Sequence, residues 1–248
     1  MCVIEGPDLV DAALESRAHF EAIYVDSDAL ARTPVAALAE RALDAGVRVF
    51  GLTGETFSRI ADAATPQGVM ASVHLPIVGF DEIASDGLVL VAHDLKDPGN
   101  AGTIIRSAEA AGARGVIFTG QSVDPCNPKA LRASAGAIFT IPVAVAELSD
   151  VLAHFRSQGA STWATLLNAT SELREVDLAG ANVVVIGSEA VGLDDAAVER
   201  CDGAFRIAMA GASESLNAGV AASLVAFAAM WQREDAKANV RRPSLERP

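Results

Sequence analysis

Short apolar runs alternate with amphipathic segments through the first part of the chain. The runs rich in valine, isoleucine and phenylalanine have the length of strands, and the segments between them repeat apolar positions at helical spacing. The pattern predicts helices over 8–16, 35–45 and 56–64, and strands over 20–25, 47–52 and 68–73. These elements form a compact α/β module with room for a three-layer sandwich.

The rest of the chain repeats the alternation over a longer stretch. Strands are expected over 88–92, 115–118, 139–145, 161–166, 183–186 and 204–207. Helices are expected over 101–111, 128–135, 148–157, 194–200 and 217–233, with a turn over 97–100. Valine-rich and isoleucine-rich strands that alternate with helices are typical of a mostly parallel sheet covered on both faces. The predicted fold class is therefore α/β.

Changes in composition along the chain indicate two folded domains, one linker between them and one tail at the C-terminus. Residues 76–86, which contain Pro76, Gly79 and several acids, are the predicted linker. They separate a first domain over 1–75 from a second over 87–235. Residues 236–248 have no apolar periodicity and are expected to form a disordered basic tail.

The composition favours a folded protein of the cytoplasm. The chain of 248 residues is 51% hydrophobic and 21% charged, so it can bury a substantial core. No apolar stretch reaches the length of a membrane span, and the N-terminus lacks the pattern of a signal peptide. The three cysteines are far apart and in no CxxC spacing, which argues against a disulfide framework and against a zinc site and fits a reducing cytoplasm.

The net charge of −13 has the wrong sign for a protein that grips nucleic acid over its whole surface. Basic residues nevertheless gather in or near the polar motif that ends at Arg106 and in the segment after it; they are Lys96, Arg106, Lys129 and Arg132. A polyanion is expected to bind at this local basic region. The alternative for each cation is an ordinary solvated surface charge.

Three separated motifs place polar groups beside glycine or alanine at the edge of an apolar run. They are Asn100-Ala-Gly-Thr-Ile-Ile-Arg106, Gly187-Ser-Glu-Ala-Val-Gly192 and Ser215-Leu-Asn-Ala-Gly219. Glycine lets backbone approach a ligand closely, so such loops at strand ends are natural binding surfaces. A dinucleotide-binding GxGxxG loop follows the first strand of its domain, whereas the motif from Gly187 to Gly192 follows a late strand and has Glu189 in place of the middle glycine. The chain also has no Walker A loop and no GxSxG elbow. The four histidines are scattered along the sequence, so no metal site is predicted.

These motifs resemble those of the SpoU, or TrmH-like, branch of the SPOUT RNA methyltransferases. Asp97-Pro-Gly-Asn100 with Gly102 and Arg106 resembles the first family motif, Ile186-Gly-Ser-Glu-Ala-Val-Gly-Leu193 the second, and Ser215-Leu-Asn217 with Ala221 the third. Asn127-Pro-Lys129, Arg132-Ala-Ser134-Ala-Gly136-Ala and Ile141-Pro142 resemble the stretch between them. Residues 1–75 are similar, more weakly, to the L30e-like RNA-binding domain that many such enzymes carry.

The resemblance implies a deep trefoil knot near the C-terminus, a homodimer with its active site near the interface, and S-adenosylmethionine as methyl donor. The implied reaction is ribose 2′-O-methylation of rRNA or tRNA. The resemblance assigns catalytic roles to Arg106, Asn100, Glu189, Ser215 and Asn217. It assigns donor binding to Gly187, Ser188, Glu189, Gly192, Ile207, Met209, Ser215, Leu216 and Asn217, and RNA binding to Lys96, Arg106, Lys129 and Arg132.

Each assignment has a structural alternative. Arginine is a poor base, so Arg106 is expected to hold a phosphate and stabilise an alkoxide; its alternative is an ion pair with Glu109. Asn100 can cap the helix that begins at Ala101, and Ser215 and Asn217 can cap the last helix. Glu189 is expected to brace its loop or a dimer, in preference to proton transfer. Ile207, Met209 and Leu216 serve equally well as core residues or as walls of the donor site.

Two departures from the family pattern concern the donor loops: Ala208 stands where proline is common, and Ala218-Gly219 replaces Val-Ser. Two other functions stay open at this level. One is a non-catalytic RNA-binding or ribosome-assembly factor of the same fold, and the other is a SPOUT enzyme that methylates a base. An enzyme that confers antibiotic resistance by modifying large-subunit rRNA is a subset of the leading hypothesis.

Overall fold

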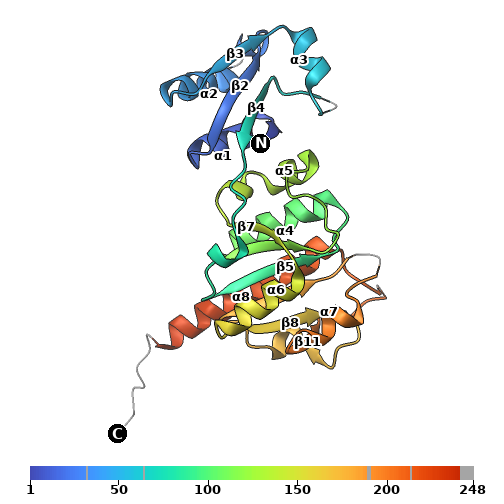
Figure 1. Cartoon of the computed structure of the whole chain (residues 1–248). Helices are drawn as coiled ribbons and strands as arrows, with labels where there is room; N and C mark the ends of the chain where they lie inside the picture. Colours follow the sequence, from blue (N-terminus) through green and yellow to red (C-terminus); the bar gives the residue numbers. More distant parts are fainter. Residues whose placement is uncertain (32, 64, 189–190, 213, 241–248) are drawn as a thin grey trace.

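The computed structural model places the elements of the chain in two α/β units, one above the other in Figure 1. It describes residues 1–31, 33–63, 65–188, 191–212 and 214–240. The first unit is built on a four-stranded sheet and the second on a seven-stranded sheet. Within the described residues, no helix combines the length and the apolar character that a membrane span requires.

The first sheet has the strand order β1-β4-β2-β3. Its strands are β1 (Cys2–Glu5), β2 (His19–Asp26), β3 (Val49–Leu52) and β4 (Val69–His74); its helices are α1 (Pro7–Glu15), α2 (Thr33–Asp44) and α3 (Gly54–Ile60). Strand β4 is antiparallel to β1 and β2, and β2 is parallel to β3. Strand β1, which is short and lies at the sheet edge, is not predicted by the hydrophobic pattern. Helix α3 ends at Ile60, before the predicted end at residue 64, which lies outside the described residues.

The second sheet has the strand order β7-β6-β5-β10-β8-β11-β9. Its strands are β5 (Leu88–His93), β6 (Gly115–Thr119), β7 (Val143–Ala146), β8 (Ser161–Thr165), β9 (Ser171–Glu172), β10 (Asn182–Ile186) and β11 (Gly203–Arg206). Every pairing within it is parallel. The predicted mostly parallel α/β sheet is confirmed. Only β9, a strand of two residues, has no counterpart in the prediction.

Helices cover both faces of this sheet. They are α4 (Pro98–Ala110), α5 (Pro128–Ser134), α6 (Leu148–Ser157), α7 (Asp195–Glu199) and α8 (Ala218–Val240), with short 3-10 turns η1 (Ala29–Ala31), η2 (Phe80–Glu82), η3 (Ala137–Phe139) and η4 (Leu173–Glu175). In β5, Leu88 and Leu90 pack with α4 and α8, whereas Val89 and Val91 pack with α6. Because successive side chains point to opposite faces, a strand buried on both sides is apolar throughout.

Three predicted boundaries change for local reasons. The expected turn over 97–100 is the start of α4, because Asp97 caps the helix and Pro98 fits its first position. The expected strand over 139–145 begins only at Val143, since η3 and Pro142 precede it. Helix α8 continues to Val240, so residues 236–240 of the expected disordered tail are helical. The remaining tail residues lie outside the described ones.

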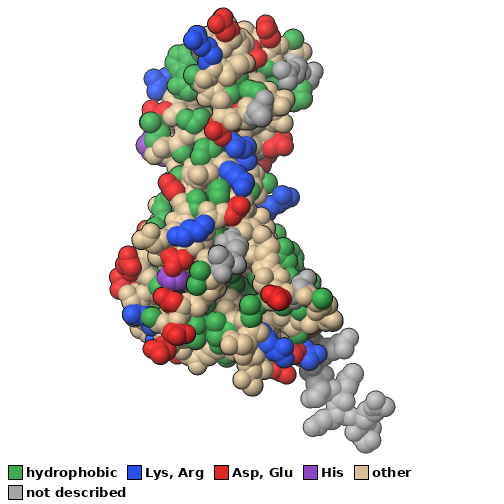
Figure 2. Space-filling view, turned by 90° about the vertical axis from the view of Figure 1, so that its right-hand side faces the viewer, with side chains coloured by type: hydrophobic (Ala, Val, Ile, Leu, Met, Phe, Trp, Pro, Cys, Tyr) green, Lys and Arg blue, Asp and Glu red, His purple; other side chains and the backbone are tan. Residues whose placement is uncertain are grey.

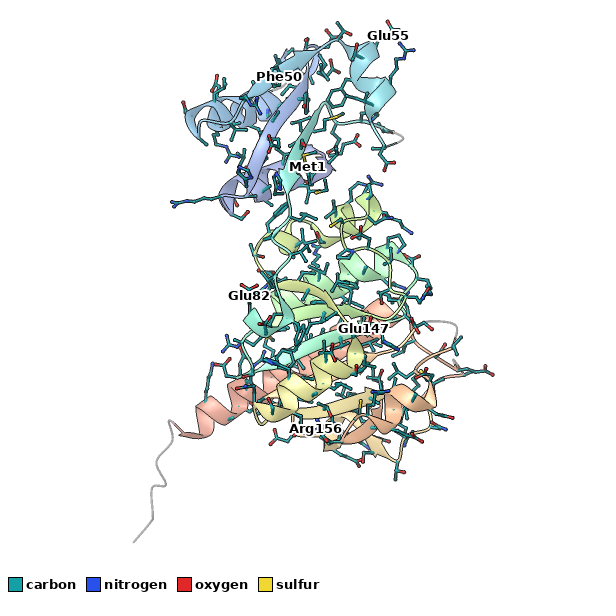
Figure 3. The ribbon with its side chains drawn as sticks, viewed as in Figure 1. Met1, Phe50, Glu55, Glu82, Glu147 and Arg156 are labelled. Atoms are coloured by element: carbon teal, nitrogen blue, oxygen red, sulfur yellow. The ribbon has the colours of Figure 1, made fainter. Side chains whose placement is uncertain are left out.

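The predicted linker packs along the edge of the second sheet. Ile77 forms a parallel bridge with Val143, and the Val78 amide donates to the Val143 carbonyl at 3.0 Å. Glu82, labelled in Figure 3, accepts a hydrogen bond from the Gly79 amide at 2.8 Å. Ile83 is buried against the face that carries α6. The segment is therefore an ordered extension of the sheet.

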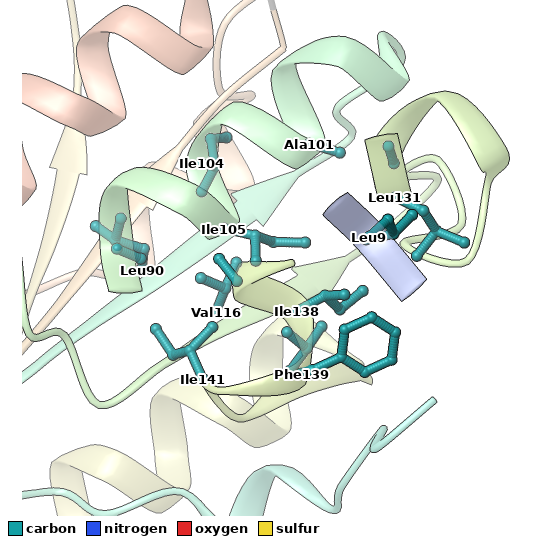
Figure 4. Close-up of a cluster of buried hydrophobic side chains, with 14 of the residues drawn as sticks. Leu9, Leu90, Ala101, Ile104, Ile105, Val116, Leu131, Ile138, Phe139 and Ile141 are labelled. Atoms are coloured by element: carbon teal, nitrogen blue, oxygen red, sulfur yellow. The ribbon is translucent and has the colours of Figure 1, made fainter. Parts of the chain in front are cut away.

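The two units share a continuous apolar cluster. Leu9 of α1 lies against Leu131 and the end of α5, close to Phe139 of η3 (Figure 4). Gly136 has φ +90°, and a Cβ atom there would lie 2.4 Å from the Cβ of Ala12 in α1. The units are thus in contact through small and apolar side chains.

We predict that Gly136→Ala weakens this contact between the units. The added Cβ meets Ala12, so the variant should lose about 1 to 3 kcal/mol of stability beyond the cost of its positive φ. Gly159→Ala is a matched control, because Gly159 has φ +85° and nothing within 4 Å of its added Cβ. Urea denaturation of both variants measures the difference. Equal losses would show that the contact at Ala12 tolerates the methyl group.

Candidate functional site

The candidate site lies at the carboxyl edge of the seven-stranded sheet. Strands β5 and β10 are parallel neighbours, and Ala92 pairs with Ile186 at their ends. The segments that follow them, which lead to α4 and to Gly187, therefore begin side by side. In open α/β sheets ligands bind beyond the carboxyl ends of adjacent strands, so the topology itself brings two of the three motifs together.

Asn100 lies inside the first turn of α4 and does not cap it. The cap is Asp97, whose carboxylate accepts from the amides of Gly99 and Asn100 at 2.5 and 3.3 Å. The predicted capping role of Asn100 is therefore wrong, because the helix begins three residues earlier. Asn100 is 9% exposed, and its Oδ1 lies 3.2 Å from the position of a Cβ built on Gly219. The first and third motifs thus meet at this side chain.

Small residues let α4 approach both α8 and α5. The Ser107 hydroxyl is 2.6 Å from the Ser223 hydroxyl, and Thr103 packs against Gly219. On the α5 side, a Cβ on Gly102 would lie 2.4 Å from the carbonyl oxygen of Ala130. No side chain larger than hydrogen fits at Gly102 without a backbone shift. The helix that carries Asn100 and Arg106 is therefore fixed between two neighbours.

The second motif is a closed turn at the end of β10. The Ser188 amide donates to the Gly192 carbonyl at 3.2 Å, and the Gly192 amide donates back to the Ser188 carbonyl at 2.9 Å. A Cβ on Gly187 would lie 2.4 Å from the Gly192 carbonyl carbon, and Gly192 has φ +74°. Both glycines are therefore required by the turn. Glu189 lies outside the described residues, so its predicted roles stay predictions.

The third motif begins α8. Asn217 accepts a hydrogen bond from the Val220 amide at 3.2 Å and acts as a helix cap, while Ser215 is exposed. Leu216 is half-buried. Ile207, just after β11, is also half-buried and packs against the core on the α4 and α8 face. Met209 is half-buried as well, so apolar side chains accompany the polar ones on this segment.

The four predicted RNA-binding cations have different surroundings. Arg106 is exposed and, among the described residues, forms no ion pair, so the alternative of a pair with Glu109 is not seen. Lys96 donates to the Gln121 carbonyl at 2.7 Å. Lys129 pairs with Asp97 at 3.3 Å, and Arg132 pairs with Asp62 of the first unit at 2.9 Å. Lys and Arg side chains are visible around the narrow junction of the units in Figure 2.

A polar network that the sequence motifs do not predict lies beside them, at the ends of β5 and β6. The Nδ1 atom of His93 lies 2.8 Å from the hydroxyl of Thr119, and Asp94 accepts from the Gln121 amide at 2.6 Å. Asp94 has φ +54°, an uncommon conformation for a residue other than glycine. The His93-Asp94 pair at the end of a buried strand was the available signal. The network fixes the loop that leads into α4.

The cysteines are not activated. Burial raises the pKa of the Cys126 thiol to about 12 and that of Cys201 to about 11, and burial also raises the pKa of Cys2. Nucleophilic cysteines have lowered pKa values, so thiol chemistry does not account for the site.

Comparison with known proteins agrees with this geometry. Residues 87–227, which carry all three motifs, match the SpoU rRNA Methylase family. The chain belongs to this family. Residues 1–71 of this SpoU methylase match the MRM3-like substrate binding domain.

Curated relatives match most of the SpoU methylase. It is 31% identical over 225 residues to 23S rRNA (guanosine(2553)-2′-O)-methyltransferase RlmP of Bacillus subtilis, which covers 91% of this chain and 86% of RlmP. It is 32% identical to 23S rRNA (guanosine-2′-O-)-methyltransferase RlmB of Vibrio vulnificus over 76% of this chain and 79% of RlmB.

Solved structures show the same architecture. The SpoU methyltransferase AviRb from Streptomyces viridochromogenes in complex with the cofactor AdoMet superposes with a TM-score of 0.82 at 27% identity, over 94% of this chain and 90% of AviRb. An AdoMet-bound rRNA methyltransferase from Sinorhizobium meliloti superposes with a TM-score of 0.81 at 28% identity, over 92% and 86% of the two chains. The expected family and the mostly parallel α/β fold are confirmed, and the trefoil knot stays a prediction.

We predict that Asp97→Ala destabilises the SpoU methylase at neutral pH by about 1 kcal/mol, because α4 loses its cap. The hydrogen bond from the Gly99 amide lowers the pKa of Asp97, and Lys129 adds to the shift. A lowered carboxyl pKa contributes stability above the unfolded-state value of about 3.9, and this contribution is lost as the pH falls through the folded-state value.

The difference in free energy of unfolding between wild type and Asp97→Ala should therefore become smaller below about pH 4. Urea denaturation from pH 7 to pH 3 measures it. Asp97→Asn, which keeps an oxygen acceptor, should retain most of the stability at pH 7. A gap that does not change with pH would show that the ionised carboxylate is not what stabilises the helix.

Proposed function

We propose that this chain is an RNA 2′-O-methyltransferase that uses S-adenosylmethionine to modify a ribose of rRNA or tRNA. The observation that carries the proposal is the position of Arg106. It lies exposed on α4, in a helix whose first turn meets α8 at Asn100 and Gly219. Family membership and the 2′-O-methyltransferase names of RlmP and RlmB support the same activity.

The residues at the sheet edge suit the donor. Gly187 and Gly192 carry no side chains at the end of β10, where a Cβ on Gly187 would lie 2.4 Å from the Gly192 carbonyl carbon, so backbone groups there can approach a ligand. Half-buried Ile207, Met209 and Leu216 offer apolar surface to an adenine ring. We assign donor binding to these segments together with Ser188, Ser215 and Asn217. S-adenosylmethionine supplies an electrophilic methyl group on its sulfonium sulfur.

The protein's task is to align and activate a weakly acidic hydroxyl. Methyl transfer is an in-line displacement, so the ribose oxygen must face the methyl carbon with water excluded. The guanidinium of Arg106 is always protonated and presents several donors, so it binds the adjacent phosphate and stabilises the developing alkoxide. The hydroxyl proton then passes to the phosphate or to solvent. Asn100, beside Gly219, holds the first and third motifs in register.

The first unit is proposed to bind RNA. We propose an RNA-binding domain over residues 1–75, a linker over 76–86 and a methyltransferase domain over 87–235. The match to a substrate binding domain supports this division. Arg106 and Lys96 are the cations best placed for phosphate, since neither pairs with a described carboxylate. Lys129 and Arg132 must first exchange Asp97 and Asp62 for RNA. Arg132 is therefore assigned mainly to the contact between the units.

A homodimer is proposed through an apolar stripe along α8. Val220, Leu224 and Trp231 are 46%, 40% and 55% exposed. Half-buried Phe227 lies between them, with its ring 6.1 Å from that of Trp231. The spacing puts all four on one side of the helix, where a second copy can cover them. We also propose the trefoil knot that the resemblance implies and the cytoplasmic location that the composition favours.

Methyl transfer from tritiated S-adenosylmethionine to unmodified ribosomal and transfer RNA, with nucleoside mapping, tests the activity. We expect label on ribose. Arg106→Ala should lower the rate by at least about a hundredfold while donor affinity, measured by calorimetry, stays within about threefold. Label on a base would support the base methyltransferase instead, and donor binding without transfer to any RNA would favour a non-catalytic factor.

Arg200→Ala is the matched control for Arg106→Ala. Arg200 is an exposed arginine at the end of α7, outside the candidate site. The methyl-transfer rate of Arg200→Ala should therefore equal that of the wild type. If Arg106→Ala transfers methyl groups as fast as this control does, the role proposed for Arg106 is wrong.

For the dimer, Leu224→Glu should shift the protein from dimer to monomer in sedimentation velocity, because a charge at the centre of the stripe would be buried without a partner. Leu43→Glu, at a leucine of α2 that is 58% exposed, is the control and should remain dimeric. A monomeric wild type, or a Leu224→Glu protein that dimerises as well as the control, would rule out this interface.

A further inference from the structure

Two histidines from distant parts of the sequence face each other on the first sheet. His19 begins β2 and His74 ends β4, and the antiparallel register pairs them directly. Their rings are 4.8 Å apart, and both side chains are exposed on the same face. Directly paired residues of antiparallel strands always share a face, so the register alone brings the imidazoles together.

A bulge adds a carboxylate to this pair. The pairing of β2 with β4 passes from Phe20 opposite Val73 to Ala22 opposite Ser72, which leaves Glu21 as the extra residue. A bulge bends its strand and redirects a side chain. The Oε1 atom of Glu21 lies 3.2 Å from Nε2 of His74. Three potential ligand atoms of His19, Glu21 and His74 therefore lie within 4.8 Å of one another.

We propose that His19, Glu21 and His74 form a binding site for a divalent transition-metal ion, with Zn²⁺ as the preferred occupant. Zinc binds imidazole nitrogen and carboxylate oxygen at about 2.0–2.2 Å, which puts tetrahedral ligands roughly 3.4 Å apart. The 3.2 Å distance between Glu21 Oε1 and His74 Nε2 is already close to this ligand spacing. The other distances among the three ligand atoms are at most 4.8 Å, and small side-chain rotations would shorten them to the same spacing. A water molecule takes the fourth position.

The surroundings hold Glu21 without blocking the oxygen that the metal needs. Arg48 donates through Nε and Nη2 to the Glu21 backbone carbonyl at 3.2 and 3.0 Å. Its nearest approach to the carboxylate is 3.5 Å, at Oε2. Oε1 faces His74, so the two oxygens have separate partners. Groups that orient a ligand in this way strengthen metal sites.

The site lies where the first unit joins the rest of the chain. His74 is the last residue of β4, and the segment that leads to Ile77 and the edge of the second sheet follows it directly. A bound ion ties this exit point to the start of β2. The metal site does not depend on the methyltransferase proposal, since its ligands lie in the first unit and its test measures metal binding, not methyl transfer.

Zn²⁺ titration of the tag-free full chain by isothermal calorimetry tests the proposal, with Co²⁺ absorption as a spectroscopic probe. We expect calorimetry to show one Zn²⁺ ion per chain. Bound Co²⁺ should show the visible absorption bands of a low-symmetry site, and these bands should disappear when Zn²⁺ displaces the Co²⁺. His19→Ala and His74→Ala should each weaken binding roughly tenfold or more, and Glu21→Gln should also weaken it. Zn²⁺ should raise the melting temperature of the wild type more than that of His74→Ala.

His154→Gln is the matched control, because it removes an imidazole that lies on α6, in the second unit. Its Zn²⁺ affinity should equal that of the wild type. Circular dichroism checks that each variant is folded. If a histidine variant fails to fold, Glu21→Gln still tests the site, because it replaces only one carboxylate oxygen with an amide group. Absence of one-to-one binding, or equal binding by wild type, His74→Ala and Glu21→Gln, would overturn the proposal.

Discussion

The candidate site depends on the parallel pairing of β5 with β10. These strands are far apart in the sequence, yet their ends lie side by side because Ala92 pairs with Ile186. The chain turns into α4 after one strand and into the Gly187–Gly192 turn after the other. The start of α4 and the second turn therefore lie at the same edge of the sheet. The pairing thus converts two weak motifs into one surface.

Close packing then fixes what the sheet has assembled. Gly102 allows α4 to touch the backbone of α5, and Gly219 allows α8 to approach Thr103 and Asn100. Side chains larger than hydrogen would separate these helices and move Arg106 with them. Glycine in this chain therefore has two distinct uses. At Gly192 and Gly136 it permits a positive φ, whereas at Gly102 and Gly219 it permits helices to approach.

Sequence patterns predicted the type of most elements and the residues of the three motifs, but not their partners. The parallel sheet was predictable because strands buried on both faces are apolar throughout. The capping role given to Asn100 was wrong, because a local preference for asparagine does not reveal that Asp97 and Pro98 start the helix earlier. The His19 and His74 pair was also out of reach, since its proximity comes from strand register and a bulge, neither of which sequence spacing encodes.

The segment that joins the units has a consequence for aggregation. Exposed strand edges present unpaired backbone groups to other chains. Residues Ile77 and Val78 cover part of β7 at one edge of the large sheet, and β9 at the other edge has only two residues, with Glu172 bridged to Arg206. Neither edge offers a long free template for adding another strand. Extension of this large sheet by strand pairing between copies is thereby disfavoured.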